Sequence, residues 1–219
     1  MSGSVDEARN ALTRVMRALA SAGLNQGATG NASVRDGTGM LITPTGVAPE
    51  ALTDVAHVVM SLDGACAPHQ ATPSSEWHFH AAIYAARPEV AAVVHVHSPH
   101  ATALACLRRE IPPFHYMISV AGGDSIRCAE YATFGTAALS AKVVTALADR
   151  KACLLANHGL IALGRDLDEA MAVATEVESL CQQYLIARQN GEPVLLSAQE
   201  MRQVIDRFKT YGKHAISSE

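Results

Sequence analysis

A turn signal at residues 36–39 constrains the fold of this chain most. Asp36, Gly37, Thr38 and Gly39 separate two short strand-like runs, residues 32–34 and 40–42, which is typical of a β-hairpin. Hairpin strands run antiparallel, so a sheet that contains this pair is not purely parallel. Because segments with helical periodicity alternate with short strand-like runs, the sequence predicts an α/β fold, a central and mainly antiparallel (mixed) sheet flanked by helices.

Periodicity and capping signals place the other elements along the chain. Helices are expected at residues 4–23, 74–87, 99–108, 136–148, 166–189 and 197–212, and further strands at 57–62, 93–96, 153–155 and 160–163. Residues 73–76 predict a helix start with a serine cap and the carboxylate of Glu76 in the first turn. No repeat or linker interrupts the sequence, so we expect a single domain over residues 1–219.

Composition and charge exclude several classes of partner. The formal net charge is -4 and no run of Lys and Arg occurs, which argues against nucleic acid. The longest uncharged stretch, residues 90–107, contains three histidines and a proline, so no membrane partner is expected. The first residues include acids and no apolar segment, which indicates a cytoplasmic protein. Five cysteines without a CxxC pair are interpreted as reduced thiols and not as ligands.

The pair His95 and His97 is the first candidate for chemistry. Residues two apart on a strand face the same side, so both imidazoles can reach one ion while Val96 packs on the other side. A lone His-x-His is more often a polar strand face, but the valines around this pair predict a buried strand, where unpartnered imidazoles are costly. This pattern favours a zinc site over a solvated face.

Further residues complete a metal centre. Catalytic zinc usually takes three protein ligands, and His158 is the best third candidate because Gly159 lets the backbone turn and bring the ring back toward the sheet. Glu76 alone is most simply a carboxylate at a helix N-terminus. If it faces the metal, it can ligate the ion at rest and act as general base once substrate displaces it.

Small residues at three corners offer donors for a phosphate. Backbone N–H groups and hydroxyls without bulk suit a phosphate dianion, and a helix N-terminus adds positive potential. Any one of these corners alone would be an ordinary turn or cap, so this hypothesis depends on the whole set. The three corners are Gly30 with Asn31, Thr45 with Gly46, and Ser74 with Ser75.

Taken in order, these motifs resemble the class II aldolase/adducin family, and within it most closely the bacterial enzymes that cleave fuculose phosphate. The segments that carry the resemblance span nearly the whole chain: residues 23–31, 41–46, 73–77, 92–98, 115–117, 131–136, 157–160 and 208–212. The resemblance implies a zinc-dependent lyase with one Zn²⁺ per subunit. Such an enzyme reversibly cleaves a ketose 1-phosphate, L-fuculose 1-phosphate or a close deoxy analogue, into dihydroxyacetone phosphate and a small aldehyde.

The resemblance also implies residue roles. Glu76 would be the acid/base carboxylate, and the zinc ligands would be Glu76 with His95, His97 and His158. The six residues at the small corners would bind the phosphate. Tyr116 would reach the site of a neighbouring subunit in a homotetramer and handle a proton at the aldehyde oxygen, Tyr211 in the C-terminal tail would close over the aldehyde end, and Phe134 would line that pocket.

Two residues depart from the family pattern, and other functions of this fold are alternatives to an aldolase. Asp124 and Arg127 stand where the closest family members carry Asn and Pro, and the roles of both residues and of His115 are open. A sugar-phosphate 4-epimerase of this fold typically has aspartate in place of Glu76, whereas a dehydratase of this fold is separated only by assay. A non-catalytic adducin-like scaffold would lack the metal histidines. The remaining histidines are expected on the surface or in packing: His57, His69, His78, His80, His100 and His214.

Overall fold

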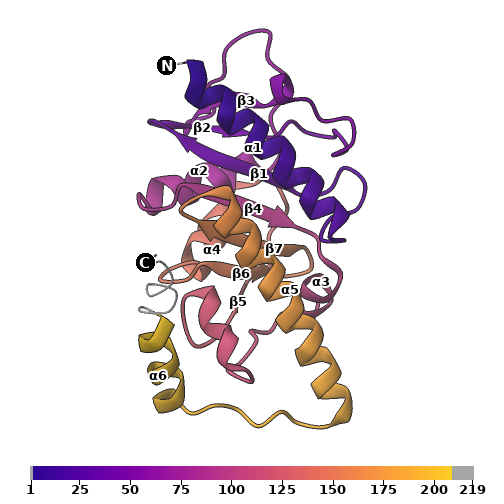
Figure 1. The fold of residues 1–219 in the computed structure, drawn as a ribbon, viewed down its shortest axis with the longest axis vertical. Helices are drawn as coiled ribbons and strands as arrows, with labels where there is room; N and C mark the ends of the chain where they lie inside the picture. The colour runs from indigo at the N-terminus through magenta and orange to yellow at the C-terminus, as the bar shows by residue number, and fades with distance from the viewer. Residues whose placement is uncertain (1, 209–219) are drawn as a thin grey trace, which may run out of the picture.

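The computed structural model describes residues 2–208. A single mixed sheet of seven strands runs through the molecule in the order β3-β2-β1-β4-β7-β6-β5 (Figure 1). The strands are β1 (Asn31–Asp36), β2 (Gly39–Ile42), β3 (Val58–Ser61), β4 (Ala92–Val96), β5 (Arg127–Ala129), β6 (Ala152–Leu155) and β7 (Gly159–Gly164). The predicted fold class, a central mainly antiparallel sheet flanked by helices, is confirmed.

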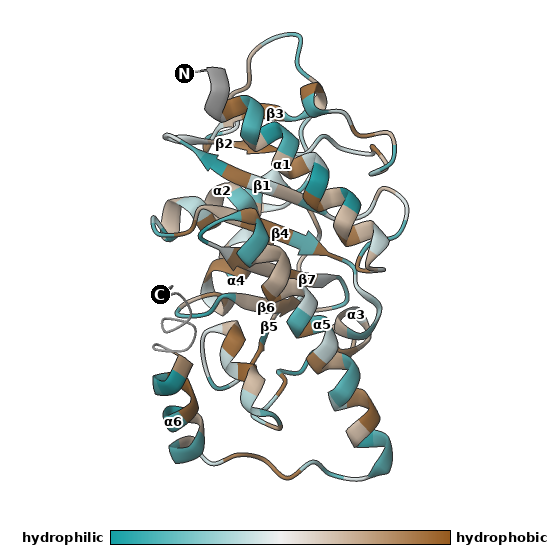
Figure 2. Cartoon of the chain, in the orientation of Figure 1, coloured by the Kyte–Doolittle hydropathy of each residue, from teal (hydrophilic) through white to brown (hydrophobic). Residues whose placement is uncertain are grey.

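Helices and short 3-10 turns connect these strands. They are α1 (Ser2–Ser21), α2 (Trp77–Ala86), α3 (Pro99–Ala105), α4 (Ala137–Ala146), α5 (Leu167–Asn190), α6 (Ala198–Phe208), η1 (Asp54–Ala56) and η2 (Tyr116–Ala121). Figure 2 shows hydrophilic and hydrophobic residues alternating along α1 and α6, as in amphipathic helices. No helix among residues 2–208 is long and apolar enough to cross a membrane.

The hairpin forms as predicted and sets the direction of the sheet. Strands β1 and β2 pair antiparallel with Asp36 opposite Gly39, and Gly37 in the turn has a φ of 55°. The remaining neighbours also pair antiparallel except β5 and β6, which are parallel and joined through α4. A parallel connection needs such a crossover, whereas antiparallel neighbours do not.

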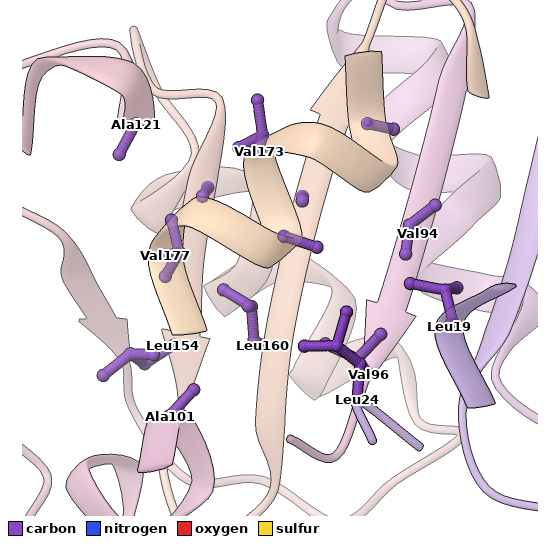
Figure 3. Packing of buried hydrophobic residues seen from close by; sticks show 14 of the residues in the cluster. Leu19, Leu24, Val94, Val96, Ala101, Ala121, Leu154, Leu160, Val173 and Val177 are labelled. Atoms are coloured by element: carbon purple, nitrogen blue, oxygen red, sulfur yellow. The ribbon is translucent and has the colours of Figure 1, made fainter. Parts of the chain in front are cut away.

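Two hydrophobic layers hold helices against the two faces of the sheet. Helices α1, α3 and α5 pack on one face, where Val94 and Val96 of β4 belong to one hydrophobic cluster with Leu19 and Val177 (Figure 3). Helices α2 and α4 pack on the other face, to which Val93 belongs. Successive β4 residues therefore point to opposite layers, and the face of Val93 is also the face of His95.

Several boundaries and elements differ from the sequence prediction. Helix α2 begins at Trp77 rather than at residue 74, and Glu76 occupies the N-cap position without a side-chain capping bond. The three-residue strand β5 and the turns η1 and η2 were not predicted, because such short segments carry too little periodicity. The predicted end of the last helix, at residue 212, lies outside the described residues.

Candidate functional site

Glu76, His95, His97 and His158 converge at one point, and their potential ligand atoms lie within 4.8 Å of one another. The Nε2 atoms of His95 and His97 are 2.9 Å apart. Glu76 reaches the pair from the other side, with Oε2 3.2 Å from His95 Nε2 and Oε1 3.1 Å from His158 Nε2. Within residues 2–208, this is the one group of three or more His, Cys, Asp or Glu side chains with such geometry.

His95 in strand β4 and His97, directly after the strand, point to the same side, as their spacing predicts. His95 is fully buried, and Val94 and Val96 pack into the opposite layer. The Nδ1 of His95 lies 2.9 Å from the carbonyl oxygen of Leu160, to which it donates. This bond fixes the ring orientation and leaves the lone pair of Nε2 facing the cluster, as in metal-bound histidines.

The turn between β6 and β7 delivers His158. Its backbone bends at Asn157, which has a φ of 55°, while Gly159 has no left-handed conformation. The expectation that Gly159 makes the turn is therefore wrong. Gly159 instead permits a close approach, because a Cβ there would lie 2.4 Å from the carbonyl oxygen of Val96 and 3.2–3.3 Å from ring atoms of His97 and His95.

Glu76 is turned away from the helix it precedes. Its side chain makes no capping bond to α2, and its Oε2 accepts a hydrogen bond of 3.0 Å from Asn31 Nδ2. Burial alone opposes the charged form, but the attraction of the imidazoles of His95 and His158 outweighs it and holds the pKa of Glu76 far below its usual range. Glu76 is thus a carboxylate dedicated to the cluster and not a helix-dipole residue.

The donor set fits a divalent metal ion. Burial, together with the neighbouring imidazoles His95 and His158, lowers the pKa of His97 to about 4, which leaves a neutral ring, the form that binds metals. Glu76 Oε1 is buried without a hydrogen-bond partner in residues 2–208. Three imidazole nitrogens and an unsatisfied carboxylate oxygen pointing at one spot are costly unless a cation lies among them.

A cavity of about 340 Å³ opens directly onto this cluster. Glu76, His97 and His158 line it. Phe134 and Tyr131 line it as well, and both residues are more than half exposed. Phe134, which is predicted to line the aldehyde pocket, therefore shares a cavity with Glu76, His97 and His158, and the lining of this cavity combines polar and aromatic side chains.

The three small-residue corners lie side by side. Ser74 N donates to Thr43 O and Thr45 N donates to Thr72 O, both at 3.0 Å, so residues 43–46 run along residues 72–75. Thr43 N also donates to Ala32 O, which brings the third corner alongside. Ser75, Thr45 and Gly46 are exposed, whereas Ser74 is buried and its Oγ accepts from Glu76 N. Because Thr45 N is already bonded to Thr72 O, this residue offers its hydroxyl rather than its amide.

Gly30 and Asn31 complete that group. Gly30 has a φ of 75°, and a Cβ there would lie 2.3 Å from the side chain of Asn25. Asn31 is buried and directs its amide to Glu76 and not to the exposed corner.

Tyr116 and His115 do not line the cavity of Glu76. Tyr116, in η2, is half exposed and lines a different cavity with Val204 and Phe208 of α6. His115 caps η2 by accepting a bond from Met117 N. Tyr211 lies outside the described residues.

The two departures from the family pattern have structural partners. Asp124 pairs with Arg150 at 2.9 Å, and Arg127 donates to the carbonyl oxygen of Ala148 at 2.7 Å, just beyond α4. Neither Asp124 nor Arg127 lines the cavity of Glu76.

His80 is the site residue that sequence reasoning missed. It is fully buried, and its Nε2 lies 2.6 Å from Asn31 Oδ1, directly behind the hydrogen bond from Asn31 to Glu76. The signal was present in the sequence, because His80 follows Glu76 by four residues and so lies on the same side of the helix one turn later.

Comparisons with known proteins agree with this geometry. The family model for the class II aldolase and adducin N-terminal domain matches residues 10–185. A 5-methylthioribulose-1-phosphate/5-deoxyribulose-1-phosphate aldolase of Rhodospirillum rubrum is 50% identical over 98% of this chain and 97% of the relative. An L-fuculose phosphate aldolase of Escherichia coli K12 is 53% identical over 87% of this chain and 88% of the relative.

A solved structure is similar over nearly the whole chain. That of an L-fuculose 1-phosphate aldolase has a TM-score of 0.89 and 38% identity, covering 93% of this chain and 96% of the other. The matched region includes His95, His97 and the turn of His158. The chain therefore belongs to the class II aldolase and adducin family, and it is an enzyme of the lyase type in that family.

Proposed function

We propose that this chain is a zinc-dependent aldolase that reversibly cleaves a ketose 1-phosphate into dihydroxyacetone phosphate and a small aldehyde. One observation carries the proposal: the carboxylate of Glu76 lies between the imidazoles of His95 and His158 and lines a cavity that aromatic side chains also line. A carboxylate in that position can exchange a proton with a carbon next to a ketone.

His95, His97 and His158 would hold the metal, with Glu76 as a fourth ligand at rest. Zinc is proposed because imidazole nitrogen suits it and because three histidines leave an open position for substrate. When bound, the ion supplies Lewis-acid polarisation of the ketone oxygen of the substrate.

Glu76 would serve as the base in the condensation direction, taking the proton from the reacting carbon of dihydroxyacetone phosphate. In the cleavage direction it would return that proton to the same carbon. Its depressed pKa describes the chain without metal or substrate, and displacement of the carboxylate from its imidazole neighbours would raise its basicity.

The phosphate would bind at the exposed edge of the three corners. Ser75 and Thr45 offer hydroxyls there, and Gly46 adds a backbone without side-chain bulk. Gly30, Asn31 and Ser74 would shape this edge from inside, because Asn31 and Ser74 are buried against Glu76.

The aldehyde end of the substrate would face Phe134 and Tyr131. These exposed aromatic rings favour a substrate whose far end is apolar, since a terminal methyl or thioether has no hydrogen bonds to lose. L-fuculose 1-phosphate, 5-deoxyribulose 1-phosphate and 5-methylthioribulose 1-phosphate, which appear in the names of the similar enzymes, all meet this condition.

Two tyrosines would complete the site from elsewhere. Tyr116 does not line the cavity of Glu76 in its own chain, which is consistent with a contribution to the site of a neighbouring subunit in a homotetramer. There it would donate its proton to the aldehyde oxygen in condensation and, as the phenolate, take the proton of the C4 hydroxyl back in cleavage. Tyr211 would close over the aldehyde end.

The test is a cleavage assay on a panel of phosphorylated sugars. Zinc-loaded protein is incubated with the three ketose 1-phosphates named above and with ribulose 1-phosphate, which carries a polar far end. Dihydroxyacetone phosphate is measured by coupled reduction. We expect release from the three apolar-ended sugars and little from ribulose 1-phosphate. Conversion of ribulose 5-phosphate to its 4-epimer, with no dihydroxyacetone phosphate from any sugar, would overturn the proposal.

Variants assign the roles within the cluster. Glu76→Gln is expected to keep most of its zinc but lose cleavage, whereas His95→Ala should lose both metal and activity. Turnover close to the wild-type rate in Glu76→Gln would show that another group is the base.

A further inference from the structure

A row of buried polar side chains runs inward from Glu76. Asn31 Nδ2 donates to Glu76 Oε2 at 3.0 Å, and Asn31 Oδ1 lies 2.6 Å from His80 Nε2. His80 Nδ1 lies 2.7 Å from Ser33 Oγ, which lies 2.8 Å from the hydroxyl of Tyr84. All four residues behind Glu76 are buried.

A spacing of two residues on a strand and a spacing of four along a helix bring these residues together. Asn31 and Ser33 are two apart on β1 and face the same side of the sheet. Glu76, His80 and Tyr84 are four apart along the start and length of α2, so they follow one stripe of the helix. The strand stripe and the helix stripe lie against each other, and a polar ladder forms in the middle of an otherwise apolar layer.

The hydrogen bonds can run in only one direction. Asn31 gives its amide protons to the carboxylate, which only accepts, so its oxygen must accept a proton from His80 Nε2. Complete burial lowers the pKa of His80 to about 3, so the ring is neutral and its Nδ1 accepts the proton of Ser33. Ser33 then accepts from Tyr84. This order requires the Nε2–H tautomer of His80.

We infer that His80 is a positioning residue for the catalytic carboxylate, acting through the amide of Asn31. Its Nε2–H holds the Asn31 oxygen inward, which keeps the Asn31 amino group toward Glu76. Without that donor, the amide can rotate and present its oxygen to the carboxylate, which repels it. The inference rests on the proposed role of Glu76 as base, and it assigns to His80 a function in addition to core packing.

The first test reads the tautomer directly. Zinc-loaded protein with ¹⁵N-labelled histidine is studied by long-range ¹H–¹⁵N correlation at pH 7, and the signals of His80 are identified by their absence in His80→Gln. We expect a neutral ring protonated at Nε2. A ring protonated at Nδ1, or at both nitrogens, would overturn the inference whether or not the enzyme cleaves any sugar.

The second test compares two replacements of the same side chain. His80→Leu fills the space without a donor, whereas the amide of His80→Gln can both donate to Asn31 and accept from Ser33. We expect His80→Leu to lower kcat and the deuterium exchange of dihydroxyacetone phosphate by about 10-fold to 100-fold, with a smaller change in KM. His80→Gln should recover most of this loss. His57→Leu, which removes a buried histidine outside the site, should keep the wild-type kcat.

The outcomes separate the two proposals. If the wild-type protein cleaves no ketose 1-phosphate, the proposed function fails, and the tautomer measurement still decides the hydrogen-bond order. If the wild type is active and His80→Leu matches it, or if His80→Gln is as impaired as His80→Leu, His80 does not position the base.

Discussion

A substitution of Gly159 tests how closely the turn that carries His158 approaches the segment that carries His95 and His97. A Cβ at this position would lie 2.4 Å from the carbonyl oxygen of Val96, well inside contact distance. Strands β4 and β7 are paired there, Val96 opposite Leu160, so neither backbone can move without breaking the sheet. Overpacking of this kind costs about 1–3 kcal/mol, and we expect Gly159→Ala to lose that much unfolding free energy.

The same substitution should damage metal binding. Relief of the clash would move His158 away from His95 and His97, and displacements of this kind lower metal affinity by about 10-fold to 100-fold. Urea unfolding of the metal-free protein and competitive zinc titration measure the two effects. Gly37→Ala is the control: its φ of 55° makes alanine cost about 1 kcal/mol, but a Cβ there touches nothing within 4 Å. Wild-type zinc affinity in Gly159→Ala would refute the argument.

Other predictions concern stability and specificity. Burial, aided by Arg9, lowers the pKa of His57 to about 4, and His57 Nε2 lies 2.9 Å from Thr13 Oγ1. As the pH falls, the unfolded chain therefore binds the proton first, so the stability that this group contributes above pH 6.5 is lost toward pH 4, by about 3 kcal/mol. The free energies of unfolding of the wild type and of His57→Leu should diverge by that amount between these two pH values. Parallel curves of unfolding free energy against pH would contradict the prediction. Arg35 donates to the carbonyl oxygens of Val90, Tyr84 and Arg87, so Arg35→Met should lose about 2 kcal/mol in the same assay, and a loss near zero would show that water replaces these bonds. Phe134→Ser should lower kcat/KM for apolar-ended sugars more than for ribulose 1-phosphate, and an equal loss for both would remove Phe134 from the aldehyde pocket.

The fold was predictable where local signals were strong. The hairpin at Gly37, the long helix that became α5 and the buried strand of His95 all formed where turn chemistry and periodicity placed them. Strand β5 was missed because residues 127–129 carry no pattern of their own and pair only through long-range contact with β6. The start of α2 was misjudged because Glu76, which resembles a first-turn carboxylate, is drawn away by the histidines.

The candidate site, too, was predictable only where local spacing determines the direction of a side chain. The spacing of His95 and His97 was enough to put both rings on one side, and the convergence of His158 and Glu76 on them is now seen in the structure. The direction in which Asn31 points was not predictable, since nothing in a Gly-Asn pair distinguishes a phosphate donor from a side chain buried against Glu76. His80 was expected on the surface or in packing, and its partners Asn31 and Ser33, nearly fifty residues away in the sequence, carry no local signal of this contact.

Anomalous diffraction from crystals of the zinc-loaded protein tests the central claim most directly. We predict one strong peak per chain at the zinc edge, at about 2.0–2.1 Å from the Nε2 atoms of His95, His97 and His158, with Glu76 beside it. A peak at another place in the chain, or no peak among these four side chains at saturating zinc, would contradict the account.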